Sequence, residues 1–167
     1  MGQNKSKTLS FDFVKQYSKD PDLAWQMIEK SQTVKTLQLP RLTGNSPRLA
    51  GHTRFVFISD THSRTSNIKP LPDGDVLIHA GDFTMTGTPE EVEKFNEFLG
   101  FSPHEHKVVI AGNHDITFDT EGYQDIWRNY GSVKHNPAEV KKLLTNCVYL
   151  EDEEVTIEGF RIYGSPW

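Results

Sequence analysis

The chain has 167 residues, of which 35% are hydrophobic and 25% are charged, and its formal net charge is −5. These values are typical of one globular domain with its own hydrophobic core. The acidic balance argues against a nucleic acid polymer as partner, because phosphate backbones attract clustered Lys and Arg. It leaves room for a small phosphorylated substrate, since a bound metal ion can supply positive charge.

Cysteine content and hydropathy indicate the cellular compartment. Cys147 is the single cysteine, so no intrachain disulfide can form. The start of the chain lacks the apolar core of a signal peptide. No run approaches the ~18 apolar residues of a membrane span. We therefore expect a reducing, cytoplasmic setting.

The first residues fit the pattern for N-myristoylation, with Gly2 exposed after removal of the initial Met and Ser6 at the required offset. One myristoyl chain binds membranes only marginally, so the pattern predicts weak, reversible membrane contact. The alternative is an ordinary start followed by a disordered tail. Residues 1–50 as a whole are predicted to form a partly disordered extension with one short helix, which Asp20 caps.

From residue 51 onward the sequence predicts an α/β domain. Short apolar runs rich in aromatic and β-branched residues predict buried strands at 55–58, 75–80 and 107–111. Helices are predicted at 88–100, 124–130 and 137–145, and a hairpin at 154–158 and 160–163. The first of these helices has the clearest start, because Thr88 and Glu91 form a capping box, and Gly100 suits its exit.

Polar motifs follow each of the three predicted strands. They are Asp60-x-His62, Gly81-Asp82 and Gly112-Asn113-His114-Asp115. Alone, each motif has an ordinary explanation, such as a capping Asp or a turn. Together, at the carboxyl ends of strands in one α/β sheet, they predict a shared ligand site.

The motifs supply the ligands of a two-metal phosphoesterase site, in which two divalent ions share a carboxylate. Asp60 and His62 can reach one ion, because side chains at i and i+2 of an extended segment share a face. Asp82 can bridge the two ions. Asn113 can offer an amide oxygen, and His114 can act on the substrate as hydrogen-bond donor or general acid. Carboxylate and imidazole ligands suit Mn, Fe or Zn.

These motifs, with the segments 51–56 and 160–167, resemble the calcineurin-like metallophosphoesterase superfamily and, more narrowly, the animal metallophosphoesterase domain-containing proteins. The resemblance covers about residues 51–167. It implies the N-terminal portion of a four-layer α/β/β/α sandwich. It also implies a phosphodiesterase that uses a metal-activated hydroxide, with cyclic nucleotides among its substrates.

The resemblance also assigns roles to single residues. Asp60 and His62 would bind the first ion, Asp82 would bridge, Asn113 would bind the second ion and His114 would assist the transition state. Asp115 would orient His114 through a hydrogen bond. Arg64 would contact the substrate phosphate, with an ordinary surface arginine as the equal alternative.

The family pattern continues with an isolated histidine and then a Gly-His-x-His block, and neither occurs before Trp167. The resemblance therefore implies at most one well-held ion in this chain. The alternative function is a truncated, non-catalytic remnant that acts through membrane or partner contacts. An open sheet edge would also allow the chain to form oligomers.

The remaining histidines are not predicted to be ligands. His79 precedes the Gly81-Asp82 turn, and we expect a structural histidine there, with a group that supports a metal ligand as the alternative. The others lie in polar segments and are expected to be solvated: His52, His104, His106 and His135.

Overall fold

The computed structural model describes residues 15–38, 43–44 and 46–166. The chain divides into two compact units, 1–41 and 42–167. In the first unit, helix α2 (Pro21–Ile28) begins as predicted, because the Asp20 carboxylate accepts a hydrogen bond from the backbone N–H of Leu23 and proline occupies the first turn. A short 3₁₀ turn, η1 (Glu29–Ser31), follows it.

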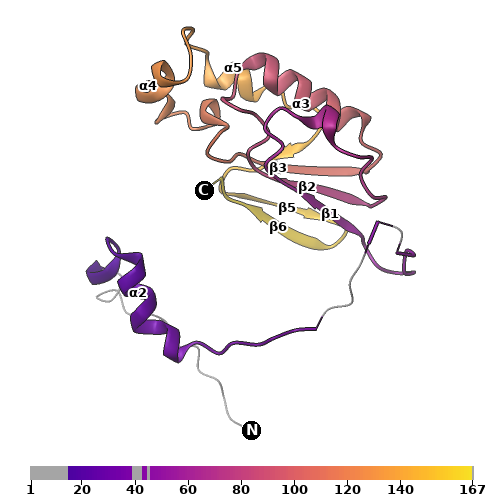
Figure 1. Cartoon of the computed structure of the whole chain (residues 1–167). Helices are drawn as coiled ribbons and strands as arrows, with labels where there is room; N and C mark the ends of the chain where they lie inside the picture. Colours follow the sequence, from indigo (N-terminus) through magenta and orange to yellow (C-terminus); the bar gives the residue numbers. More distant parts are fainter. Residues whose placement is uncertain (1–14, 39–42, 45, 167) are drawn as a thin grey trace. The chain divides into compact units, whose positions relative to one another are not determined.

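A four-stranded parallel sheet forms the centre of the second unit (Figure 1). Its strands follow the chain order: β1 (Phe55–Ile58), β2 (Val76–Ala80), β3 (His106–Ile110) and β4 (Val148–Tyr149). The parallel register is continuous, with Phe55 opposite Val76 and Val76 opposite His106. The predicted α/β class is thus confirmed, and β4 is a strand that the sequence did not predict.

The helices of the second unit are α3 (Pro89–Phe101), α4 (Tyr123–Ile126) and α5 (Pro137–Lys141), with 3₁₀ turns η2 (Thr65–Asn67), η3 (Ile116–Phe118) and η4 (Trp127–Asn129). Helix α3 has the predicted capping box. Two predicted ends were wrong, because α3 continues past Gly100 and α5 stops well before residue 145. No helix in the described part of the chain is long and apolar enough to cross a bilayer.

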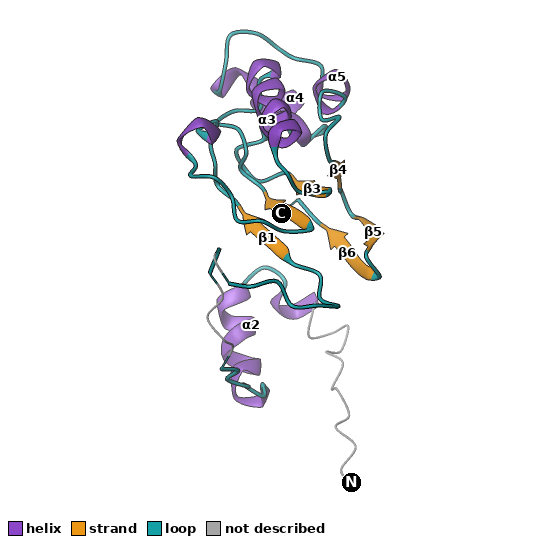
Figure 2. Ribbon diagram, turned by 90° about the vertical axis from the view of Figure 1, so that its right-hand side faces the viewer, coloured by secondary structure: helices purple, strands orange, loops and turns teal. Residues whose placement is uncertain are grey.

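Helices α3 and α5 cover one face of the sheet (Figures 1 and 2). Helix α3 buries Val92, Phe95 and Leu99, which are spaced to share one side of the helix. They pack in one cluster with Leu77 and Val109 of the sheet. This cluster is the larger core of the second unit.

The predicted hairpin covers the opposite face with β5 (Glu153–Ile157) and β6 (Phe160–Gly164) (Figure 1). Its two-residue turn has Glu158 and Gly159 at positive φ, which matches the twist of paired strands. Helices, parallel sheet and hairpin give the order α/β/β. The prediction that β1 is buried was wrong for Phe57, which is 66% exposed, because the hairpin leaves the β1 edge of this face uncovered.

Candidate metal centre

The loops after β1, β2 and β3 join at the carboxyl end of the sheet. The N–H groups of Asp60 and His62 donate to the carbonyl oxygens of Gly81 and Asp82, each over 3.0 Å. Gly81 has φ of +97°, and a Cβ there would press on the Gly112 backbone, so the second and third loops meet through glycine. The three predicted motifs therefore form one structure.

Backbone strain is concentrated in these loops. Asp60, His62, Ser63 and Asp82 have φ of 56°, 42°, 59° and 56°, in the left-handed region that side chains disfavour. Each such residue costs on the order of 1–3 kcal/mol and persists only where surrounding contacts hold it. Strain of this kind is typical of functional sites.

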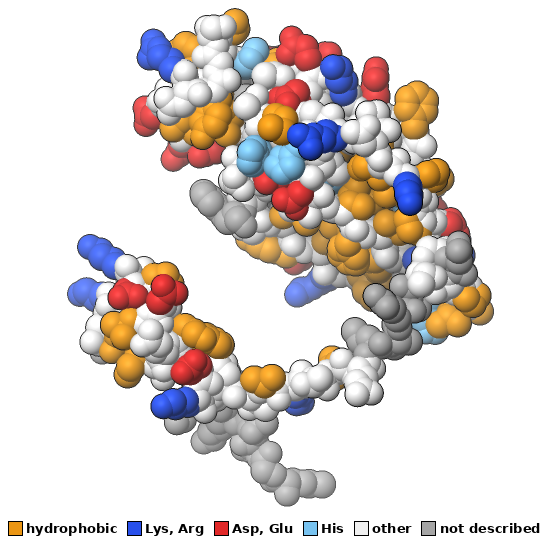
Figure 3. Space-filling model, viewed as in Figure 1, with side chains coloured by type: hydrophobic (Ala, Val, Ile, Leu, Met, Phe, Trp, Pro, Cys, Tyr) orange, Lys and Arg blue, Asp and Glu red, His pale blue; other side chains and the backbone are white. Residues whose placement is uncertain are grey.

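Three side chains bring possible ligand atoms together. Those of His62, Asp82 and His114 all lie within 4.8 Å of one another. The His62 Nε2 atom is 4.0 Å from an oxygen of Asp82 and 4.0 Å from an oxygen of Asp60. Figure 3 shows histidine and acidic side chains gathered in one place on the surface of the second unit. The structure thus joins His114 to the predicted ligands His62 and Asp82.

The donor set fits a divalent ion. Neither ring nitrogen of His62 has a close partner: Nδ1 is buried without a hydrogen bond, and Nε2, which faces the carboxylates, is 4.0 Å from the nearest oxygens of Asp60 and Asp82. Asp82 is only 8% exposed, and one of its oxygens accepts the His114 N–H over 2.9 Å while the other faces His62. Imidazole nitrogen with carboxylate oxygen is a combination that Mn, Fe and Zn accept.

A backbone carbonyl orients His114. Its Nδ1 atom lies 3.0 Å from the Met85 carbonyl oxygen. A carbonyl can only accept, so Nδ1 carries the proton, and Nε2 of the neutral ring is the nitrogen with a free lone pair. Ligating histidines commonly donate their second ring N–H in this way.

The predicted hydrogen bond from Asp115 to His114 was wrong, because the Asp115 carboxylate is used elsewhere. It is 1% exposed and accepts from the N–H groups of Phe83, Thr84 and Gly112 and from the Thr84 hydroxyl. Burial raises the pKa of Asp115, and these hydrogen bonds oppose the rise. Asp115 therefore ties the second loop to the third.

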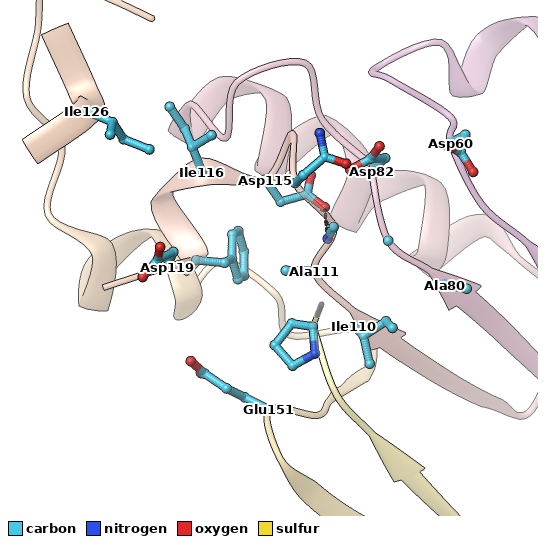
Figure 4. A pocket seen from close by; sticks show the side chains of 15 residues that line it. Asp60, Ala80, Asp82, Ile110, Ala111, Asp115, Ile116, Asp119, Ile126 and Glu151 are labelled. Atoms are coloured by element: carbon cyan, nitrogen blue, oxygen red, sulfur yellow. Dashed lines mark hydrogen bonds between the residues drawn. The ribbon is translucent and has the colours of Figure 1, made fainter. Parts of the chain in front are cut away.

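The other predicted residues lie around the cluster. Asp60 and Asn113 line a cavity of about 500 Å³ that also contacts Asp82. Figure 4 shows Asp60, Asp82 and Asp115 along one part of this cavity, and Asp119 and Glu151 along another. Arg64 is exposed on the loop after His62. Gly2 lies outside the described residues.

His79 is buried beneath the first loop. Its Nε2 atom lies 3.0 Å from the Thr61 hydroxyl, and its ring packs edge-on against Phe95 at 4.9 Å. Burial lowers its pKa to about 4, so the ring is neutral near pH 7. His79 is thus a structural histidine that also holds Thr61, the residue between Asp60 and His62.

The prediction that His104 is solvated was wrong. It is 1% exposed, and its two ring nitrogens bond the Ser102 hydroxyl at 2.7 Å and the Pro72 carbonyl at 3.0 Å. Burial lowers its pKa. His104 connects the segment before β2 to the segment before β3, outside the metal centre.

Met85 and Thr84 support the site but were not predicted from the sequence. Met85 acts through its backbone, which no side-chain pattern can reveal. Thr84 acts through a hydroxyl that reaches a residue 31 positions away. The capping box around Glu91 was a visible signal, but it predicted only a helix start.

Comparison with known proteins defines the class. The family model described as calcineurin-like phosphoesterase matches residues 53–166. That range contains the sheet, the three loops and every residue of the cluster. The chain belongs to the calcineurin-like phosphoesterase family.

Individual relatives show a more specific likeness within this family. The chain is 48% identical to metallophosphoesterase domain-containing protein 1 of Homo sapiens, and to that of Mus musculus, over 92% of this chain and 51% of each relative. It is 40% identical to a UPF0046 protein of Caenorhabditis elegans over 91% of this chain and 41% of that protein. The chain spans about half the length of the curated relatives it matches.

The extent of the likeness corrects one expectation. A match over 92% of the chain leaves less than a tenth unmatched, so it includes most of the first fifty residues. The expectation that the resemblance begins near residue 51 was wrong. Short family motifs were absent from that segment, whereas the overall alignment detects its similarity.

Proposed function

We propose that this chain binds a divalent metal ion and uses it to hydrolyse a phosphoester, with a phosphodiester as the preferred substrate. One observation supports this proposal most: ligand atoms of His62, Asp82 and His114 lie within 4.8 Å of one another where three family motifs meet. A binuclear site remains part of the proposal, with Asp82 as the shared carboxylate and Asn113 beside the second ion.

The roles of the residues follow from their positions. His62 and Asp82 would hold the ion, and Asp60 lies close enough to His62 to join them. Divalent ions bound there would polarise a phosphoryl oxygen and lower the pKa of a water molecule. His114, held through Nδ1, directs Nε2 to the site and would donate a hydrogen bond or proton to the leaving oxygen when protonated.

The cavity beside the cluster offers room for the organic part of a substrate. Away from Asp60, Asp82 and Asp115, its lining is mixed: the apolar side chains of Ile110, Ile116, Phe118 and Ile126 stand beside the acids Asp119 and Glu151. The apolar side chains suit a flat apolar group such as a nucleobase. We therefore keep cyclic nucleotides as candidate substrates, and Arg64, which is exposed two residues after His62, as a candidate phosphate contact.

Hydrolysis of a generic phosphodiester by the purified chain, with and without Mn²⁺, tests the proposal. Asp82→Asn keeps the shape of the side chain and removes its charge, so we expect Mn-dependent activity to fall at least 100-fold. Asp73→Asn is the matched control, because Asp73 is an exposed acid that pairs with Arg48 away from the cluster. Equal activity in wild type and Asp82→Asn would contradict the proposal.

A second candidate function is a metal-binding protein without hydrolytic activity. The described residues gather one group of three ligands, fewer than a two-ion site needs. Binding of Mn²⁺ that depends on Asp82, without hydrolysis above the Asp82→Asn background, would favour this second function.

Location is also a proposal. We propose a cytoplasmic protein with reversible membrane contact through myristoylated Gly2, on the strength of the N-terminal pattern. Intact mass after co-expression with an N-myristoyltransferase tests it. An unmodified Gly2 would end the proposal.

A further inference from the structure

Glu91 receives more hydrogen bonds than a helix cap requires. A capping box needs its carboxylate to accept from the N-cap N–H, and Glu91 does accept from Thr88 over 3.1 Å. It also accepts from the Ser63 hydroxyl at 2.7 Å and from the Met85 N–H at 2.9 Å. Thr86 adds two further contacts. The extra donors come from the loops after β1 and β2, which carry the site.

One oxygen of Glu91 connects to both histidines. Its Oε1 atom accepts from Ser63, the residue after His62. The same atom accepts from the N–H of Met85, whose carbonyl oxygen receives Nδ1 of His114. The two histidine rings stand edge to face with centroids 4.6 Å apart. The same carboxylate oxygen is therefore linked to both rings. It reaches His62 through the neighbouring Ser63, and it reaches His114 through the Met85 peptide group.

The conformation of the first loop requires such support. His62 and Ser63 both have positive φ, and two consecutive residues in this state need contacts that hold them. The N–H of Ser63 donates to Phe83 over 3.0 Å, and its hydroxyl donates to Glu91. Burial raises the pKa of Glu91, but these hydrogen bonds outweigh burial and lower it overall, so the carboxylate is ionised near pH 7.

We propose that Glu91 is a positioning residue of the metal centre, which sets the orientation of His62, a proposed ligand of the ion, and of His114, the proposed proton donor. This inference rests on the proposed metal function. Glu91 does not touch the ligand atoms. It acts through Ser63 on one histidine and through the Met85 peptide on the other, and it transmits the rigidity of helix α3 to both.

Mn²⁺ affinity of the full chain provides the first test. In Glu91→Gln the side-chain NH₂ group faces N–H and O–H donors of the loops, so some of these hydrogen bonds are lost. We expect the Kd for Mn²⁺ to rise about tenfold. Ser63→Ala removes one link and leaves the cap intact, so we expect a rise of about threefold. Glu90→Gln changes an exposed acid in the same helical turn and should leave the Kd unchanged.

The tautomer of His114 provides a second test, which needs no metal. Long-range ¹⁵N–¹H NMR of the metal-free wild type should show the Nδ1–H tautomer alone, and Glu91→Gln should show a mixture with Nε2–H. Leu99→Ala controls for a merely structural role, because it removes a buried side chain of α3 about two turns beyond Glu91 and leaves every hydrogen-bond partner of the carboxylate in place. It should lower the Tm and leave the tautomer unchanged.

The two tests separate the inference from the proposed function. Failure of the wild type to bind Mn²⁺ would overturn the proposed function, while the tautomer would still report on Glu91. An unchanged His114 tautomer in Glu91→Gln, with a Kd that matches Glu90→Gln, would overturn the positioning role. If Glu91→Gln does not fold, Ser63→Ala replaces it in the Mn²⁺ titration, and an unchanged Kd in that variant would overturn the positioning role.

Discussion

The two faces of the parallel sheet differ in how completely they are covered. On the helix face, Leu77, Phe83 and Phe95 are at most 1% exposed. On the hairpin face, Val76 and Val108 are buried, but Phe57 of β1 is 66% exposed. The residues that hold the site, His79, Asp115 and Glu91, all connect to the helix side. The comparison indicates that the helix face carries the larger core and the groups that hold the metal centre, whereas the hairpin face buries a smaller cluster of its own.

The largest expected effect is in the helix-side core. Phe95 stacks on Phe83 at 4.5 Å and meets His79 edge-on. Phe95→Ala should therefore lower the free energy of unfolding by about 3–5 kcal/mol, through lost transfer energy and the cavity left behind. Urea denaturation followed by circular dichroism measures it. A loss below ~1 kcal/mol would contradict the difference between the faces.

Acidic pH should destabilise the helix side of the sheet. The pKa of His79 falls to about 4 in the folded chain, below its ordinary 6.5, because the ring is buried. As the pH falls, His79 therefore binds a proton in the unfolded chain before it does so in the folded chain. Its contribution to the free energy of unfolding is complete above pH ~6.5 and is lost as the pH falls toward 4. The contribution is up to about 3 kcal/mol.

Denaturation at several pH values, with a chelator present, measures this effect. In His79→Gln the side chain cannot titrate, so the variant should lose that part of the slope. Buried His104, whose pKa is also lowered, contributes in the same direction and remains in the variant. An identical slope in wild type and variant would show that His79 does not carry the effect.

Asp115 tests the link between the ligand loops. In Asp115→Asn the amide nitrogen must face N–H donors, which leaves buried groups of Phe83, Thr84 or Gly112 without an acceptor. We expect a loss of about 2 kcal/mol in unfolding free energy. Asp125→Asn, at an exposed acid of α4, is the matched control. Equal stability of the two variants would argue against this role.

The smallest expected effect is on the hairpin face. Phe57→Ala removes a ring that is already two-thirds exposed, so unfolding free energy should change by less than ~1 kcal/mol. The same urea titration measures it, directly beside Phe95→Ala. A loss as large as that of Phe95→Ala would mean that both faces are equally important to stability.

Much of this arrangement was predictable from local pattern. Apolar runs indicated three of the four parallel strands, and Gly159 between two predicted strands indicated the hairpin. The polar motifs identified His62 and Asp82 because ligand type and position after a strand are local properties. β4 was missed because a two-residue strand has no periodicity of its own.

The rest depended on contacts between distant residues. An apolar run cannot tell which face is covered, so exposure of Phe57 was not predicted. His104 is buried because Pro72, far along the chain, accepts from its ring. Asp115 was assigned to its neighbour His114, whereas two of the residues that donate to it, Phe83 and Thr84, lie 32 and 31 positions away. Local pattern located the ligands but not the groups that hold them.

The most direct test of the central claim is an isothermal titration of the purified, metal-free chain with Mn²⁺, beside Asp82→Asn and Asp73→Asn. We expect saturable binding by wild type and Asp73→Asn, and at least tenfold weaker binding by Asp82→Asn. Binding of equal strength in all three, or no binding by the folded wild type, would contradict the claim that the loops after β1, β2 and β3 form a metal centre.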